Sequence, residues 1–157
     1  MTRTFLLAAA LLSASAAVAA PPAVFLKDAI RGNFSEVTLG RMIQNRGASS
    51  EVRQFGGMLV SDHSKSLAQA QQIASRMHLR IPVMLTPEAR HEQVVLRNLR
   101  GGAFDREVRR YMIDDHRKDI AKFNAQAHSG DRVTARYAAA TVPVMQHHLS
   151  MARSLRR

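Results

Sequence analysis

The sequence predicts an all-α protein: a bundle of four long amphipathic helices, with one long connection that contains a short helix. Apolar residues recur at steps of three and four along four long stretches, which is the spacing of one helix face. No stretch shows the strict apolar–polar alternation of a half-buried strand. Glycines at positions 47, 101, 102 and 130 lie between the periodic stretches and separate them into individual helices.

The first two long helices are expected over residues 22–46 and 50–77. Gly47 ends the first helix, and the hydroxyl group of Ser49 or Ser50 can cap the amino end of the second. Because so few residues separate the two helices, they are expected to pack as an antiparallel hairpin.

Residues 80–102 form a crossover from this hairpin to the next one. Pro82 interrupts any continuous helix there, the Thr-Pro-Glu sequence at 86–88 is typical of a helix start, and Gly101 and Gly102 end that short helix. Two hairpins joined by one long crossover are the connectivity of ferritin-like bundles. The sequence therefore predicts a ferritin-like four-helix bundle in which the second and third long helices run parallel.

The second hairpin contains the last two long helices. The third helix begins near Phe104 and ends at Gly130, and Asp131 can cap the helix that follows. On steps of three and four, the final helix is expected to bury one stripe, which consists of Val133, Tyr137, Thr141, Val144, His148, Met151 and Leu155.

The first 19 residues have the pattern of a secretory signal peptide. Arg3 supplies a positive start, an apolar run extends from Phe5 to Leu12, and Ala17-Val18-Ala19 is a small-x-small cleavage site. The apolar run is far shorter than the ~20 residues that a membrane span requires. We therefore predict cleavage before Ala20, one domain over residues 20–157, a periplasmic or secreted location, and no transmembrane span after the signal is removed.

The composition limits the classes of partner. The chain has 23 Lys and Arg against 12 Asp and Glu, a formal charge of +11, which becomes +10 when Arg3 leaves with the signal peptide. Such a charge favours anionic envelope components. Nucleic acid is not expected, because the chain is exported, its basic residues are spread over all helices, and it has no Trp and only two Tyr. The absence of Cys leaves His, Met and carboxylates as possible metal ligands.

Four potential metal ligands occupy apolar stripes, one on each long helix: Glu36, His63, His116 and His148. Counted from the two hairpin turns, their depths in the bundle differ by two to five positions, which is roughly 3–8 Å at ~1.5 Å per residue. One carboxylate and three imidazoles suit a transition-metal ion, with zinc favoured and copper or iron possible. The four side chains are therefore predicted to bind one metal ion in the bundle core.

Other interpretations of these positions remain open. Each His can be an ordinary core residue, in which case the protein is a metal-free envelope protein that binds anionic partners through its basic surface. Asp62 and Asp115 precede two of the candidate histidines but point about 100° away around their helices. They are expected to lie on a solvated face and to pair with Lys65 and Lys118.

Methionine suggests a second alternative, copper handling. Met112 lies four residues before His116, while Met145 and Met151 lie three residues before and after His148. Thioether and imidazole groups therefore share a helix face, and soft sulfur with nitrogen selects copper(I). Methionine also fills apolar cores, so this pattern is compatible with simple packing.

Four segments occur in a characteristic order along the chain: FSEVTLG at residues 34–40, MLVSDH at 58–63, the stretch from Phe104-Asp105 to His116, and Val142-Pro143 followed by His148-Leu149. This ordered set resembles a bacterial ferritin-like family catalogued as domain of unknown function 4142. The similarity covers nearly the whole chain after the signal peptide. It implies an exported helical bundle and supplies no activity.

The sequence departs from the iron-binding ferritins at their metal ligands. Paired Glu-x-x-His motifs would place carboxylates three residues before His63 and His148, where this chain has Val60 and Met145. Two-iron oxygen chemistry is therefore not expected. No motif identifies a catalytic nucleophile, and the sequence predicts a binding protein in preference to an enzyme.

Overall fold

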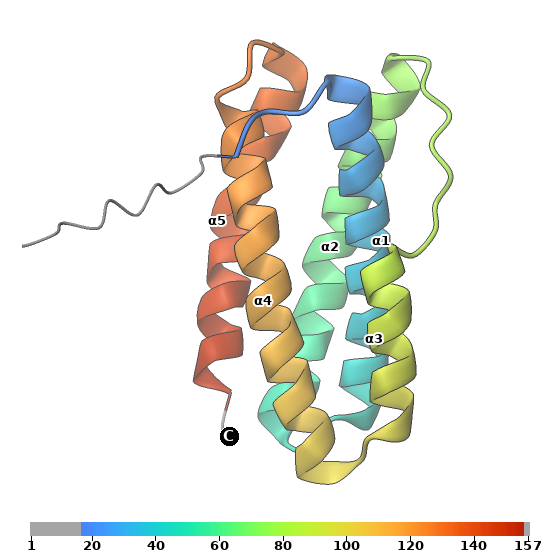
Figure 1. The fold of residues 1–157 in the computed structure, drawn as a ribbon, viewed down its shortest axis with the longest axis vertical. Coiled ribbons are helices and arrows are strands. Elements are labelled where there is room, and N and C mark those ends of the chain that lie inside the picture. The colour runs from blue at the N-terminus through green and yellow to red at the C-terminus, as the bar shows by residue number, and fades with distance from the viewer. Residues whose placement is uncertain (1–16, 156–157) are drawn as a thin grey trace, which may run out of the picture.

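The computed structural model describes residues 17–155, and within this range the chain forms five α-helices and no strand (Figure 1). The helices are α1 (Pro22–Arg46), α2 (Ser50–Arg76), α3 (Pro87–Asn98), α4 (Gly101–Ala127) and α5 (Arg132–Ser154). The all-α prediction is confirmed. Residues 1–16 of the proposed signal peptide lie outside the described residues, as do residues 156 and 157.

Side-chain caps begin three of the helices at the positions that the sequence indicates. The side chain of Ser49 accepts a hydrogen bond from the backbone N–H of Val52 at the start of α2. Thr86 does the same for α3 and Asp131 for α5. Each cap satisfies a backbone N–H group that has no partner within its helix, so these residues determine where the helices begin.

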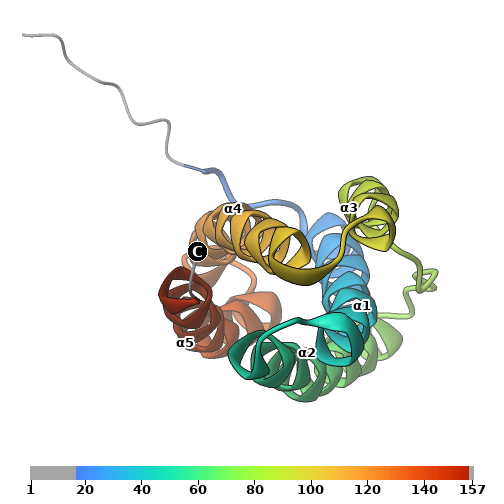
Figure 2. The ribbon, with the colours of Figure 1, turned by 90° about the horizontal axis from the view of Figure 1, so that it is seen from below.

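The two hairpins lie side by side, with α1 against α2 and α4 against α5. The crossover returns the chain along the bundle before α4 begins, so α2 and α4 run in the same direction (Figure 1). Viewed along the bundle, α3 lies outside the four long helices, beside α1 and α4 (Figure 2). This arrangement confirms the connectivity predicted from the crossover length.

Two apolar clusters fill the bundle, one toward each end. The first contains Phe55 and Phe104, and the second contains Phe25 and Phe123. On each long helix, the polar position predicted as a ligand lies in sequence between the residues of the first cluster and those of the second. The predicted ligands therefore form a polar layer in mid-bundle, with an apolar core above it and another below it.

The expected buried stripe of α5 is confirmed at four of its seven positions: Tyr137, Thr141, His148 and Leu155. It was wrong at Val133, Val144 and Met151, which are exposed, whereas the neighbouring Met145 and Ala152 are buried. Adjacent positions lie about 100° apart on a helix, and apolar residues occupy both members of the pairs 144–145 and 151–152, so spacing alone does not choose between them.

Within residues 17–155, no helix is both long enough and apolar enough to span a bilayer.

Candidate metal centre

Three of the four predicted ligands meet in the polar layer. His63 on α2, His116 on α4 and His148 on α5 have ring centroids 5.1–5.8 Å apart. One nitrogen from each ring lies within 4.8 Å of a nitrogen of the other two. The three side chains are 7%, 2% and 0% exposed, so this histidine cluster is enclosed by the bundle.

The outward-facing nitrogen of His63 is a hydrogen-bond donor. Its Nδ1 lies 2.9 Å from Oδ1 of Asn33, whose amide nitrogen donates to the carbonyl of Ala29 at 2.7 Å. Because that carbonyl only accepts, the Asn33 amide orientation is settled and its oxygen must face His63. His63 therefore carries its proton on Nδ1. Its Nε2 is buried, without a hydrogen-bond partner among the described residues, and holds a free lone pair.

The other two rings are oriented in the same manner. Nδ1 of His116 donates to the Met112 carbonyl at 3.0 Å, and Nε2 of His148 donates to a carboxylate oxygen of Asp62 at 3.2 Å. In the neutral rings this leaves Nε2 of His116 and Nδ1 of His148 as lone-pair nitrogens, 3.4 Å apart. All three inward nitrogens of the histidine cluster can therefore donate electron pairs to one ion.

Burial keeps the three imidazoles neutral. Desolvation, with the neighbouring His116 and His148, lowers the pKa of His63 well below its usual 6.5. Desolvation and His148 lower the pKa of His116 to about 3. The pKa of His148 is also lowered by burial, although Asp62 opposes the shift. The neutral ring is the form that binds a metal ion, so the cluster is ready to bind at neutral pH.

Glu36 lies in a second group of potential ligands that overlaps the first. One oxygen each of Glu36 and Asp115 lies within 4.8 Å of the other and of a His116 nitrogen. Glu36 is buried, and its Oε2 has no hydrogen-bond partner in the described part of the chain. The structure thus gathers the histidines directly and places the predicted carboxylate beside one of them.

The expectation that Asp115 pairs on a solvated face was wrong. Its half-buried carboxyl group faces Glu36 in the cleft between α1 and α4, because α4 turns the side of the helix next to His116 toward α1. Asp62 does pair with Lys65, at 3.3 Å, as expected, but it also orients His148. Asn33 was not predicted as a residue of the site. Its position on the apolar stripe of α1, one turn before Glu36, is a signal that could have indicated it.

The Glu36–Asp115 pair holds a proton at neutral pH. Desolvation, and then the charge of Asp115, raises the pKa of Glu36 well above 4.5. Burial and the charge of Asp119 raise the pKa of Asp115 to about 7. Two adjacent carboxyl groups, one buried and one half-buried, cannot both ionise cheaply, so one proton stays with the pair. A cation bound beside them would replace that proton.

Glu36→Gln is expected to stabilise the metal-free protein at pH 8 by more than about 1 kcal/mol, and to change little at pH 4. A carboxyl group whose pKa is raised by folding costs no stability below its unfolded pKa. The cost appears as the pH rises from that value through the folded pKa. Urea denaturation of both proteins at the two pH values measures the difference. Glu51→Gln, on the exposed side of α2, is the control, and an equal effect of Glu36→Gln at both pH values would contradict the shift.

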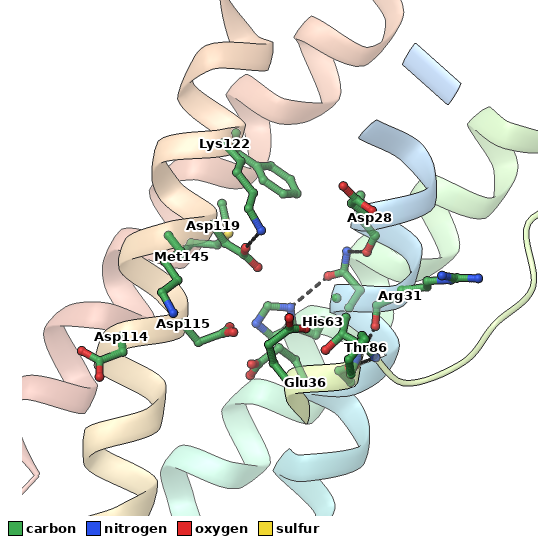
Figure 3. Close-up of a pocket in the computed structure, with 18 of the residues that line it drawn as sticks. Asp28, Arg31, Glu36, His63, Thr86, Asp114, Asp115, Asp119, Lys122 and Met145 are labelled. Atoms are coloured by element: carbon green, nitrogen blue, oxygen red, sulfur yellow. Dashed lines mark hydrogen bonds and ion pairs between the residues drawn. The ribbon is translucent and has the colours of Figure 1, made fainter. Parts of the chain in front are cut away.

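A deep cleft between α1 and α4 reaches this site. Its volume is about 1000 Å³, and it extends from the surface to Glu36 and His63, with part of α3 along its rim. Figure 3 shows Asp28 and Arg31 on the α1 side and Asp119 and Lys122 on the α4 side. The polar layer is therefore accessible to small solutes from one side of the bundle.

Comparison with known protein families identifies a match over nearly the whole chain. Residues 8–155 match the model of a family described as a domain of unknown function, DUF4142. No curated protein and no solved structure matches the chain. The match extends over all five helices and every residue of the candidate site.

Proposed function

Since this chain belongs to the DUF4142 family, whose description names no activity, we propose its function from the geometry: it binds a transition-metal ion through His63, His116 and His148. In this proposal Glu36, beside His116, is the fourth ligand and supplies negative charge through its unpartnered Oε2. The role is binding, and the proposal includes no catalytic step.

One observation carries this proposal: three neutral imidazoles direct lone pairs at one another while an acceptor holds each outer nitrogen. Buried polar groups normally form hydrogen bonds with each other, but three nitrogens that each present a lone pair have no proton to share. A cation bound between them would accept all three lone pairs. Metal-bound histidines also characteristically donate their second N–H group to a carboxylate or a carbonyl oxygen, which is the role of Asp62, Asn33 and Met112 here.

The donor set favours zinc. Three nitrogens and one carboxylate oxygen match the ligands and the coordination number that zinc prefers. Imidazole also suits copper and iron, so these ions are the competitors. Buried Met145 lines the same cleft as His63, and this favours copper(I) as the second candidate, because a thioether is a soft ligand. We propose that the protein works in the periplasm or outside the cell, on the strength of the leader pattern in residues 1–19.

The experiment is metal analysis of protein purified without a His-tag, after dialysis against zinc or copper. Wild-type protein should retain about one ion per chain, and His148→Ala should lose most of it, since a ligand and its Asp62 contact disappear together. His147→Ala is the matched control, because it removes an exposed imidazole from the adjacent position. If His148→Ala and wild-type protein retain equal metal, the cluster is a set of core histidines. Salt-dependent binding to anionic vesicles would then support the alternative based on the basic surface.

A further inference from the structure

The cleft between α1 and α4 is large enough for a small organic molecule. Its volume of about 1000 Å³ lies at the upper end of the range for small-molecule sites, roughly 300–1000 Å³. Part of its wall is apolar, formed by Phe25, Phe123 and Met145, and the two phenyl rings meet edge to face at 4.9 Å. The cleft therefore offers an apolar surface next to the polar layer.

Acidic residues are concentrated in this cleft, although the protein as a whole is strongly basic. The chain has 12 acidic residues and a formal charge of +11. Seven of the acidic residues line the cleft, against four Arg and Lys: Asp28 and Glu36 on α1, Glu88 and Glu92 on α3, and Asp114, Asp115 and Asp119 on α4. With one proton on the Glu36–Asp115 pair, six negative charges face four positive charges, so the cleft keeps a small net negative charge in a basic protein and attracts cations.

Two of these carboxyl groups have an oxygen that no described residue satisfies. They are Oε2 of Glu36 and Oε1 of Glu92, in side chains that are 4% and 2% exposed. Glu92 has an ion pair with Arg110 through its other oxygen, at 3.5 Å. A buried acceptor without a donor is costly. In the metal-free protein a ligand that carries N–H groups would remove that cost at either oxygen, and with a metal ion at Glu36 it would do so at Glu92.

Two lysines of α4, Lys118 and Lys122, line the cleft. The Lys122 side chain is 60% exposed, and its ammonium group points into the cleft and contacts Asp119 at 3.1 Å (Figure 3). Burial alone would lower the pKa of Lys122, but Asp119, Asp115 and Asp28 outweigh it and raise the pKa. The carboxylates of α1 and α4 therefore stabilise an alkylammonium ion at this position.

We propose that the cleft between α1 and α4 binds small organic cations that carry a primary ammonium group on an aliphatic chain. The ammonium group contacts the carboxylates of α4 and α1 beside Lys122, and the aliphatic chain lies against Phe25, Phe123 and Met145. Glu36 and His63 line both the cleft and the proposed metal site, but His116 and His148 do not line the cleft, and Asp119, Lys122 and the apolar wall belong to the cleft alone. Ammonium binding at Asp119 therefore does not require the proposed metal ion.

The test is calorimetric titration of the metal-free protein with n-butylammonium chloride at low salt. Butylammonium should bind, butyrate and n-butanol of the same length should not, and binding should weaken steeply as salt screens the carboxylates. Asp119→Asn should weaken binding by about tenfold, because one charge-assisted contact is lost. Asp114→Asn serves the same purpose if that variant does not fold. Glu51→Gln, outside the cleft, should bind as wild type does.

Two Lys122 variants make the test specific. Lys122→Ala vacates the position beside Asp119 and should bind butylammonium more tightly than wild-type protein does. Lys122→Met removes the charge but fills the space, and it should bind more weakly than Lys122→Ala. Equal affinity in the two variants, or equal heat from butanol and butylammonium, would overturn the proposal. His148→Ala should still bind butylammonium, so failure of the metal site and failure of the cleft are distinguishable.

Discussion

Zinc at about a thousand times its dissociation constant is expected to raise the free energy of unfolding by about 4 kcal/mol, because the folded state alone presents the three inward nitrogens together. In a chain of this size the melting temperature should rise by roughly 10 °C. Calorimetric scans with and without zinc measure the shift. His63→Ala and His116→Ala should abolish it, whereas His147→Ala should keep it.

The pH dependence of the zinc effect follows from the buried histidines. An exposed histidine, with a pKa near 6.5, would become protonated and lose its metal as the pH falls to about 6. In the folded protein the pKa of His116 is lowered to about 3, and that of His63 is well below 6.5. The imidazoles should therefore keep their zinc at pH 5.5. Only the contribution of Glu36, whose proton the zinc ion displaces, should weaken as the pH falls. Glu36→Gln removes that contribution, so loss of half the remaining shift at pH 6.5 in this variant would show that the imidazoles titrate as exposed groups do.

The metal-free protein should itself lose stability in acid. The lowered pKa of His116 means that the unfolded chain takes up a proton near pH 6.5 and the folded protein does not. The contribution of this residue to stability is therefore complete above pH 6.5. It is lost as the pH falls from there toward about 3, the folded pKa of His116. The carboxyl pair has the opposite dependence, because its cost appears as the pH rises above 4.5. The free energy of unfolding should therefore be greatest between about pH 4.5 and pH 6.5.

Gly56→Ala is expected to lower the free energy of unfolding by about 1–3 kcal/mol or more, because α1 and α2 approach too closely for a methyl group there. A Cβ atom at Gly56 would lie 2.5 Å from the backbone nitrogen of Gln44 and 2.7 Å from the carbonyl oxygen of Gly40. Backbone atoms cannot rotate away as a side-chain end can, so the helices must separate. Urea denaturation measures the loss.

The adjacent glycine provides the matched control. A Cβ atom at Gly57 would meet only the side-chain amide of Gln44, at 3.4 Å, and that group can move. Gly57→Ala should therefore be neutral, or should stabilise the helix interior by up to about 1 kcal/mol. Equal losses for the two substitutions would show that the close approach of the helices does not determine the cost.

Local features of the helices were predictable from the sequence. Capping groups act on N–H groups two or three residues ahead, so Ser49, Thr86 and Asp131 mark helix starts without reference to the rest of the fold. The parallel course of α2 and α4 was predictable from the length of the crossover, because a long connection can return the chain along the bundle before the next helix begins. Polar residues on the four apolar stripes indicated the layer in which the site lies.

The sequence by itself determined which residues lie near mid-bundle and the chemistry that they offer. Only the tertiary structure decided which of them meet. The rotation of each helix about its axis depends on packing against its neighbours, and this rotation turns Asp115 inward to Glu36 and Asp62 toward His148. The burial of Met145 in place of Val144 has the same origin. A step of one residue turns a side chain by about 100°, and local spacing cannot resolve that angle when both neighbours are apolar.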